Sequence, residues 1–183
     1  MAESRFYDEG AIRRAAVNLF YGWGYNFYRK ENQLRADDQL VRAKAAWLLG
    51  LAAESLQRAE TEYRRAALPT PTRERPYPDP AAVAGAQALE RLCGAVSALI
   101  GRIEAQPVPE NDRMTQRYRR EAATLEALGR QDELLVGLCD DLRARLEGCD
   151  GPGALQRLAE LQGSVSEIEA ILRQRAAVLL DRG

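Results

Sequence analysis

Four carboxylate side chains lie beside the apolar lines of stretches whose spacing is helical: Glu54, Glu121, Asp132 and Glu169. Carboxylates that point inward from several helices can bind a hard cation through oxygen ligands alone. The di-iron sites of helical bundles also need a Glu-x-x-His motif, and this sequence contains no His. The other role for such residues is to pair with Arg between helices, or to set the packing register as polar seam residues do in coiled coils. We expect neither a metal ion nor a cofactor.

The absence of His excludes His-metal sites, Ser–His and Cys–His nucleophile pairs, and proton transfer by imidazole. The three cysteines, Cys93, Cys139 and Cys149, are an odd number without the spacing of a zinc site, and we expect reduced thiols. Cys93 and Cys139 fall on apolar helical lines, where Cys acts as a small hydrophobe. No P-loop, dinucleotide fingerprint or nucleophile elbow is present. The sequence therefore predicts that the protein is not an enzyme.

An aromatic cluster spans residues 20–28, where six of the twelve aromatic residues occur within nine positions. Rings at this spacing cover every side of a helix, so they cannot all face one core. Exposed aromatic side chains are typical of protein-binding hot spots. Internal packing with Tyr hydroxyls at the rim, or a pocket that stacks a base or a small molecule, would use the same rings. We predict a partner-binding site at Tyr21, Trp23, Tyr25 and Tyr28.

The densest basic patch covers residues 113–120, with four Arg and a Tyr in eight positions. It lies where a helix should begin, and the helix dipole slightly disfavours cations there. Nearby carboxylates, solvent or an external anion could offset that charge. The patch would grow if a neighbouring helix end brought in Arg64, Arg65, Arg73 and Arg75. The predicted anion or nucleic-acid contact consists of Arg113, Arg117, Tyr118, Arg119 and Arg120.

Residues 114–146 form the stretch around which the other elements must be arranged. Steps of four and three residues give a heptad seam: Met114, Tyr118, Glu121, Leu125, Leu128, Asp132, Leu135, Cys139, Leu142 and Leu146. No Pro interrupts this run, which predicts a long helix packed against other helices. At 1.5 Å per residue it would be about 50 Å long. A helix of that length needs partners to bury its apolar stripe.

Four further helices are predicted from apolar spacing, over residues 9–31, 38–67, 81–105 and 153–181. We expect a break near Asn32–Asp37, because one continuous helix from Glu9 to Leu68 would reach about 90 Å. Residues 69–80 contain five prolines and form either a stiff crossover in polyproline geometry or a ligand for an SH3-like or WW-like module. Asp79 and Pro80 are a strong helix start.

The overall composition is that of an ordinary soluble protein: 183 residues, 46% hydrophobic and 29% charged, with a net charge of −1. This length fits one helical-bundle domain over residues 1–183. The net charge provides no overall attraction to nucleic acid or to an anionic membrane. The first residues lack the apolar region of a signal peptide, and no run of about 18 uncharged apolar residues occurs. We expect a cytoplasmic protein without a membrane contact.

The predicted fold is all-α: an up-and-down helical bundle of about five helices, four long ones and an aromatic N-terminal helix, with one Pro-rich crossover. Long seams and surplus aromatic residues without a catalytic set favour a non-enzymatic scaffold or adaptor that contacts another protein or itself. Two alternatives remain open. One is a helical subunit of a nucleoprotein assembly that contacts nucleic acid through the Arg patch, and the other is a bundle that binds a small ligand.

Overall fold

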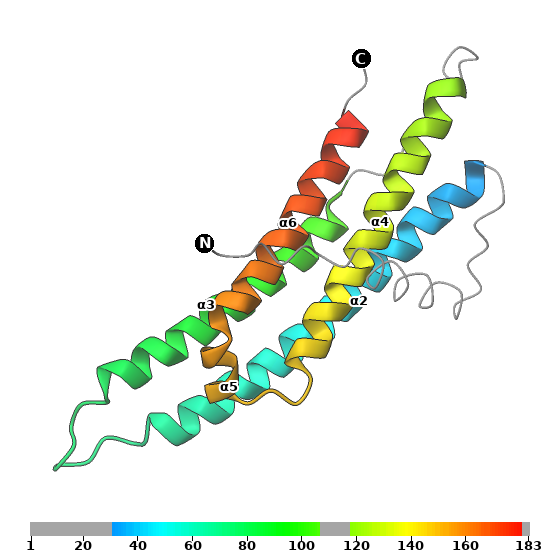
Figure 1. Ribbon diagram of the computed structural model, residues 1–183. Coiled ribbons are helices and arrows are strands. Elements are labelled where there is room, and N and C mark those ends of the chain that lie inside the picture. The colour runs from blue at the N-terminus through cyan, green and yellow to red at the C-terminus, as the bar shows by residue number, and fades with distance from the viewer. Residues whose placement is uncertain (1–30, 107–117, 181–183) are drawn as a thin grey trace.

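The computed structural model describes the backbone of residues 31–106 and 118–180 and the side chains of residues 39–106 and 127–178. Within these ranges the chain forms no strand and five helices (Figure 1): α2 (Glu31–Ala67), α3 (Pro80–Glu104), α4 (Tyr118–Leu146), α5 (Gly151–Gln156) and α6 (Leu158–Leu180). The predicted all-α bundle is confirmed. The aromatic helix predicted over residues 9–31 lies, apart from its last residue, outside the described residues.

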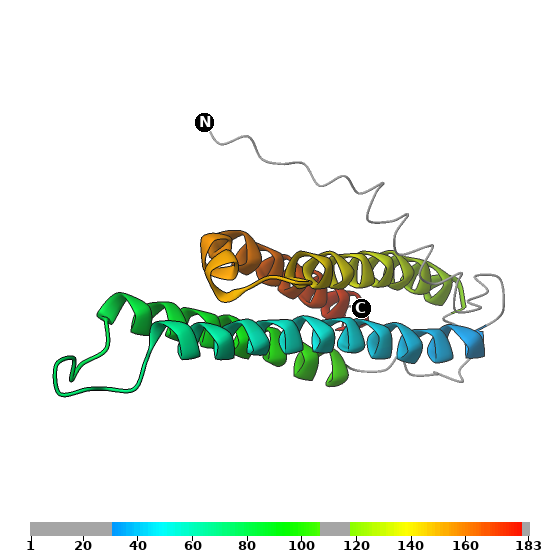
Figure 2. The same cartoon turned by 90° about the horizontal axis from the view of Figure 1, so that it is seen from below.

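The four long helices form two layers that pack on each other (Figure 2). In one layer α2 runs beside α3, and in the other α4 runs beside α6. Between the layers α2 packs on α4 and α3 packs on α6. Successive long helices run in opposite directions (Figure 1). This is the up-and-down order expected from the sequence, with the loop between α2 and α3 at one end of the bundle.

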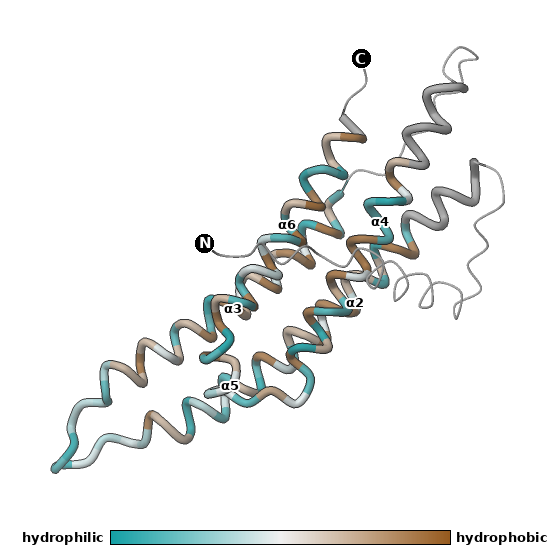
Figure 3. Tube along the Cα trace, viewed as in Figure 1, coloured by the Kyte–Doolittle hydropathy of each residue, from teal (hydrophilic) through white to brown (hydrophobic). Residues whose placement is uncertain are grey.

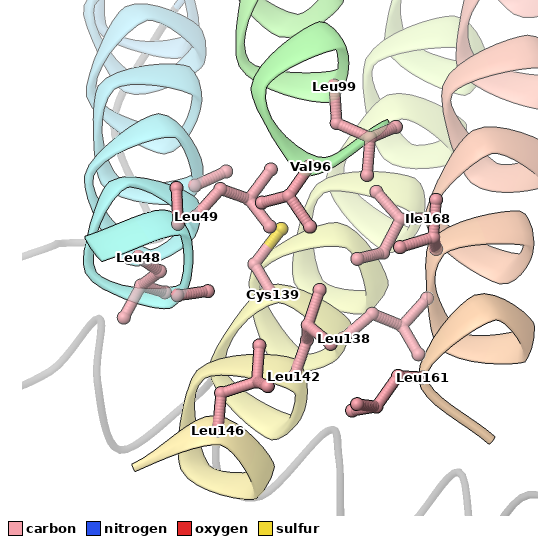
Figure 4. Close-up of a cluster of buried hydrophobic side chains, with 14 of the residues drawn as sticks. Leu48, Leu49, Val96, Leu99, Leu138, Cys139, Leu142, Leu146, Leu161 and Ile168 are labelled. Carbon is pink, nitrogen blue, oxygen red and sulfur yellow. The ribbon is translucent and has the colours of Figure 1, made fainter. Parts of the chain in front are cut away.

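The core lies between the two layers and contains apolar side chains from all four long helices (Figure 4). Leu48 and Leu49 of α2, Val96 of α3, Leu142 of α4 and Ile168 of α6 are all buried in this single cluster. Each such side chain contributes about 1.5–3 kcal/mol relative to an exposed one. Apolar residues recur along each helix, whereas the loop between α2 and α3 is hydrophilic (Figure 3). Burial of this cluster is therefore what holds the helices together.

The heptad seam predicted for α4 faces the core. Its described members are all buried: Leu128, Asp132, Leu135, Cys139, Leu142 and Leu146. Because this seam repeats about every 3.5 residues, it stays on one side of the helix for its full length. The seam prediction is confirmed over these residues, and it includes one buried carboxylate.

The predicted break near Asn32–Asp37 is wrong, because α2 is helical from Glu31 onward. No Gly or Pro occurs between Glu31 and Leu49, so no residue in this stretch interrupts the backbone hydrogen bonds. The length argument favoured a break somewhere between Glu9 and Leu68, but it did not determine at which residue α2 begins. α2 ends at Ala67, one residue before Leu68, whose helical conformation Pro69 disfavours.

The start of α3 agrees with the prediction from its sequence. The Asp79 side chain accepts a hydrogen bond from the Ala81 amide at 2.9 Å, and Pro80 occupies the first helical position, where no amide donor is needed. The side chains of Ala86, Leu89, Val96 and Ile103 are buried. Local sequence therefore determines both where α3 begins and which face it buries.

The helix predicted over residues 153–181 is two helices, α5 and α6, which meet at Arg157. α4 ends at Leu146, and Gly148 follows it with a φ of 68°, a left-handed conformation that glycine adopts at little cost. Asp150 then caps α5 by accepting a hydrogen bond from the Gly153 amide at 2.8 Å. The Arg157 side chain donates to the Arg145 carbonyl oxygen at 3.1 Å. This contact with the end of α4 holds the bend, so that α5 crosses the end of the bundle.

Candidate functional site

The side chains of both predicted binding patches lie outside the described residues, so the structure does not locate either patch. The aromatic residues Tyr21, Trp23, Tyr25 and Tyr28 lie outside them, as do Arg113 and Arg117. The backbone of Tyr118, Arg119 and Arg120 forms the first turn of α4, but their side chains lie outside the described set. Both patches therefore stay predictions.

The condition under which the basic patch would grow is not met in the described residues. Arg64 and Arg65 lie near the end of α2, and Arg73 and Arg75 lie in the following loop. This loop is at the opposite end of the bundle from the first turn of α4 (Figure 1). The up-and-down topology separates the two groups, because α2 and α4 run in the same direction. These arginines cannot extend the patch within one chain.

Two of the four acidic residues beside the apolar lines, Asp132 and Glu169, form ion pairs between helices. Asp132 of α4 accepts a hydrogen bond from Arg175 Nε of α6 at 2.8 Å. Glu169 of α6 pairs with Arg102 of α3 at 2.7 Å. Glu54 is exposed on α2, and the side chain of Glu121 is outside the described set. No group of three or more Asp, Glu or Cys side chains in the described part of the chain is arranged to hold a metal ion.

Asp132 belongs to a polar cluster that connects α2, α4 and α6 with the segment just after α3. We define the polar cluster as Arg42 of α2, Gln106 just after α3, Asp132 of α4 and Arg175 of α6. Arg175 donates to the Gln106 side-chain oxygen at 3.3 Å, and Arg42 donates to the Gln106 carbonyl oxygen at 2.9 Å. The side chain of Arg175 is 0% exposed. This cluster braces the bundle with directional contacts inside an interior that is mostly apolar.

Burial governs the electrostatics of the polar cluster. It raises the pKa of the Asp132 carboxyl to about 7, while the charge of Arg42 lowers this pKa and that of Glu133 raises it. Burial also lowers the pKa of Arg175, although a guanidinium stays charged near neutral pH. The Arg175 Nε–H can donate to Asp132 whether or not the carboxyl is ionised. Only the carboxyl can therefore change its charge near pH 7.

Sequence reasoning missed the Arg175 partner of Asp132. Arg175 lies three residues after buried Leu172 and seven after buried Ile168, so it occupies an apolar position of α6. An Arg at such a position is seldom buried unless an acceptor faces it. The position of Arg175 on the apolar stripe of α6 was the feature of the sequence that could have indicated its burial. The identity of the acceptor depends on α4, which is distant in sequence.

An apolar strip runs along the outer face of α2. We define the α2 strip as Leu40, Ala43, Trp47 and Leu51, which share one helix face by their spacing of three, four and four residues. Leu40 is 50% and Trp47 51% exposed, and both are among the few large apolar side chains exposed in the described residues. The Lys44 ammonium lies 3.9 Å from the centroid of the Trp47 ring, a cation–π contact that orients the indole.

The free end of the α2–α3 pair begins where Tyr63 packs between two glycines. A Cβ on Gly85 would lie 2.5 Å from the Tyr63 hydroxyl oxygen, and a Cβ on Gly151 would lie 2.5 Å from Tyr63 Cβ and 2.8 Å from the Ala59 carbonyl oxygen. These glycines let α3 and α5 approach α2 closely. Beyond this junction α2 and α3 continue past α5 as a projecting hairpin (Figures 1 and 2).

The projecting hairpin ends in the proline-rich loop of residues 68–79. Arg64 pairs with Glu60 of its own helix and, at 2.9 Å, with Glu90 of α3, which ties the two helices together. A turn links the backbone of Thr72 and Arg75, with the Thr72 amide donating to the Arg75 carbonyl oxygen at 3.1 Å. Tyr77 stands between Pro76 and Pro78 and is 86% exposed. The loop thus presents an aromatic ring on a stretch of backbone that proline restrains.

The cysteines behave largely as their positions predict. Cys139 is buried in the core and Cys93 packs at its edge, and none of the three forms a disulfide. Burial raises the pKa of both Cys93 and Cys139, so neither thiol is activated as a nucleophile.

Two observations bear on the wider class of the protein. By length and composition alone, α3 is apolar enough to cross a membrane, but the core helix of a bundle meets the same two criteria. No protein-family model matches the chain, and comparison with curated proteins and with solved structures finds no significant similarity. The functional argument therefore rests on the surfaces described above.

Proposed function

We propose that the protein is a helical scaffold or adaptor that acts through protein–protein contacts. The observation that supports this most directly is the projecting hairpin with Tyr77 at its end, 86% exposed. Aromatic side chains are enriched among the few residues that supply most of the binding energy at interfaces. The flanking prolines restrict the loop before binding, which lowers the entropy lost when a partner orders it.

The hairpin is well built to present this loop. The Arg64–Glu90 pair and the Tyr63 junction fix its base against α5 and the rest of the bundle. The apolar core beneath provides the rigid support that a contact site needs. Tyr21, Trp23, Tyr25 and Tyr28 are proposed as a second contact surface, on the basis of sequence alone.

The test is affinity purification of the full chain from its native source, followed by identification of the bound proteins. Tyr77→Ala should lower the affinity of a bound partner by at least about 30-fold, which corresponds to the 2 kcal/mol of a hot spot. Tyr77→Phe is the matched control, because it keeps the ring and the loop. Trp23→Ala and Tyr25→Ala examine the second surface.

Two outcomes would count against the proposal. A wild-type chain that is monomeric by light scattering and retains no other protein would contradict the scaffold function. Equal recovery of a partner with wild type, Tyr77→Ala and Tyr77→Phe would remove the hairpin as the contact site.

A further inference from the structure

The loop at the far end of the projecting hairpin (Figure 2) contains two exposed guanidinium groups, those of Arg73 and Arg75. No ion pair or side-chain hydrogen bond joins either group to any residue that the structure describes. Arg64, at the base of the hairpin, differs in being paired with Glu90 of α3. A guanidinium stays charged and presents five N–H donors in a planar fork. Both loop arginines therefore keep all of these donors for another molecule.

The backbone around these two arginines is held in a closed turn. The Thr72 amide donates to the Arg75 carbonyl oxygen, and the Arg75 amide donates to the Thr72 hydroxyl oxygen, each over 3.1 Å. Pro71 precedes this turn and Pro76 follows it, and each proline fixes its own φ. A partner therefore has to order less of this backbone than that of an unrestrained loop, which lowers the entropy lost on binding.

We infer that the hairpin loop binds an acidic protein surface, whose Asp or Glu carboxylates pair with Arg73 and Arg75 beside the site that takes Tyr77. The inference rests on the proposed function and adds the chemical class of the partner. A guanidinium matches a carboxylate through two parallel N–H···O hydrogen bonds. Arg and Tyr are also two of the three residue types enriched among the hot spots of protein interfaces.

The distribution of charge favours an acidic partner. Residues 69–78 contain two Arg and one Glu, so this end of the hairpin is positive, although the whole chain has a net charge of −1. Interfaces place surfaces of opposite charge against each other, and this arrangement excludes partners of like charge. A carboxylate-bearing surface therefore suits the loop better than it suits the molecule as a whole.

A nucleic-acid backbone fits the same loop less well. A protein that follows such a backbone can make about 6–10 phosphate contacts, whereas residues 69–78 contain only two cationic side chains. Glu74 lies between these two in the sequence and would repel a continuous row of phosphates. A protein surface can instead place a separate carboxylate beside each arginine. The loop therefore favours protein over nucleic acid as its partner.

A zero-length cross-link tests for carboxylates in contact with the loop. The chain contains only two lysines, Lys30 and Lys44, and Lys44 is buried. Arg73→Lys with Arg75→Lys keeps both positive charges and adds two exposed amines. A carbodiimide activates a carboxylate, and the amine then attacks the activated carbonyl carbon, so that an amide forms and the carbodiimide leaves as a urea.

Full-length variants are purified with their partner from the native source, treated with the carbodiimide and analysed by mass spectrometry. The variant with the two new amines should form amides from position 73 or 75 to Asp or Glu of the partner. The matched control is Arg130→Lys, because Arg130 is exposed on α4 in the other layer. This control should form no amide with the partner.

Affinity measurements test the same contacts without a cross-link. Arg73→Gln with Arg75→Gln should weaken binding of the copurified partner about 10-fold or more, the effect of losing a hydrogen bond to a charged group. It should also reduce the salt dependence of the affinity. Arg130→Gln should change neither. Because both loop side chains are exposed and make no described contact, these substitutions leave the folded structure intact.

Three results would overturn the inference. No amide to the partner, with an affinity that the Gln substitutions leave unchanged, would exclude an acidic contact. The proposed function would still stand if Tyr77→Ala lost the partner. Release of the bound material by a nuclease would overturn the inference in favour of nucleic acid. A wild-type chain that retains no other protein would overturn both the inference and the proposed function.

Discussion

Arg175 of α6 donates a hydrogen bond from Nε to Oδ1 of Asp132 on α4 over 2.8 Å, inside the bundle. The two residues are 43 positions apart in the sequence. Each occupies a position in its own helix where an apolar residue would be expected. Each provides the hydrogen-bond partner that the other needs when it is buried. The pair also reaches Gln106 and, through it, Arg42 of α2, so it helps to define which helix faces meet.

The first prediction is that removal of one member of this pair costs more than removal of both. Asp132→Leu should destabilise the protein by about 3–5 kcal/mol, because the Arg175 guanidinium would stay charged and buried without its acceptor. Arg175→Met should cost less, since the Asp132 carboxyl can take up a proton. The double variant should unfold close to the wild type in urea, because an apolar pair replaces the ion pair. Simple addition of the two single effects would contradict the coupling.

The second prediction concerns pH. Burial raises the pKa of Asp132 to about 7, well above the ordinary value of about 3.9 in an unfolded chain. Between these values the folded state holds a proton that the unfolded state has lost. The stability that this group contributes is therefore complete below about pH 4 and is lost as pH rises to about 7.

Urea unfolding at a series of pH values measures this effect. The wild type should lose stability relative to Asp132→Asn as pH rises from 4 to 7, because Asn keeps the acceptor for Arg175 and does not titrate. The charged groups of Arg42, Glu133 and Arg175 around the carboxyl are unchanged in this control. A constant difference in the free energy of unfolding between the two proteins over this range would show that burial does not raise the pKa of the Asp132 carboxyl.

The third prediction concerns the junction at the base of the projecting hairpin. Gly151→Ala should destabilise by about 1–3 kcal/mol, because its new Cβ would meet Tyr63 and the Ala59 carbonyl oxygen. Gly163→Ala on α6 is the control, since nothing lies within 4 Å of its Cβ position. That change should stabilise by about 0.5–1 kcal/mol, as Ala replaces Gly in an open helical position. Thermal unfolding compares the two, and equal shifts would argue against close packing at Gly151.

The fourth prediction separates the core from the outer face of α2. Leu142→Ala should cost about 2–5 kcal/mol, because it removes a fully buried side chain and leaves a cavity between the layers. Leu40→Ala is the matched change at a half-exposed position and should cost much less. Urea unfolding should show this order. A larger loss at Leu40 would mean that the outer face contributes as much to the fold as the core.

Much of the fold could be predicted from the sequence, and the reasons are local. The α4 seam, the Asp79–Pro80 start of α3 and the apolar face of α3 depend on residues within a few turns of one another. The start of α2 was predicted wrongly because Asn32–Asp37 contain no Gly or Pro that would end a helix, and no cap residue there forces a helix to start. The break between α5 and α6 was missed because it depends on a contact from Arg157 to the end of α4.

The sequence alone determined that this chain is helical, which residues line each apolar stripe, and which chemistry the lack of His excludes. Only the tertiary structure decided which helices are neighbours, that Arg175 faces Asp132, that Tyr63 packs against Gly85 and Gly151, and that Leu40 and Trp47 remain uncovered by the described helices. The physical reason is the range of the interactions. A helix and its apolar stripe follow from spacing within one segment, whereas an ion pair, a close approach or an open face exists only when two distant segments are placed side by side.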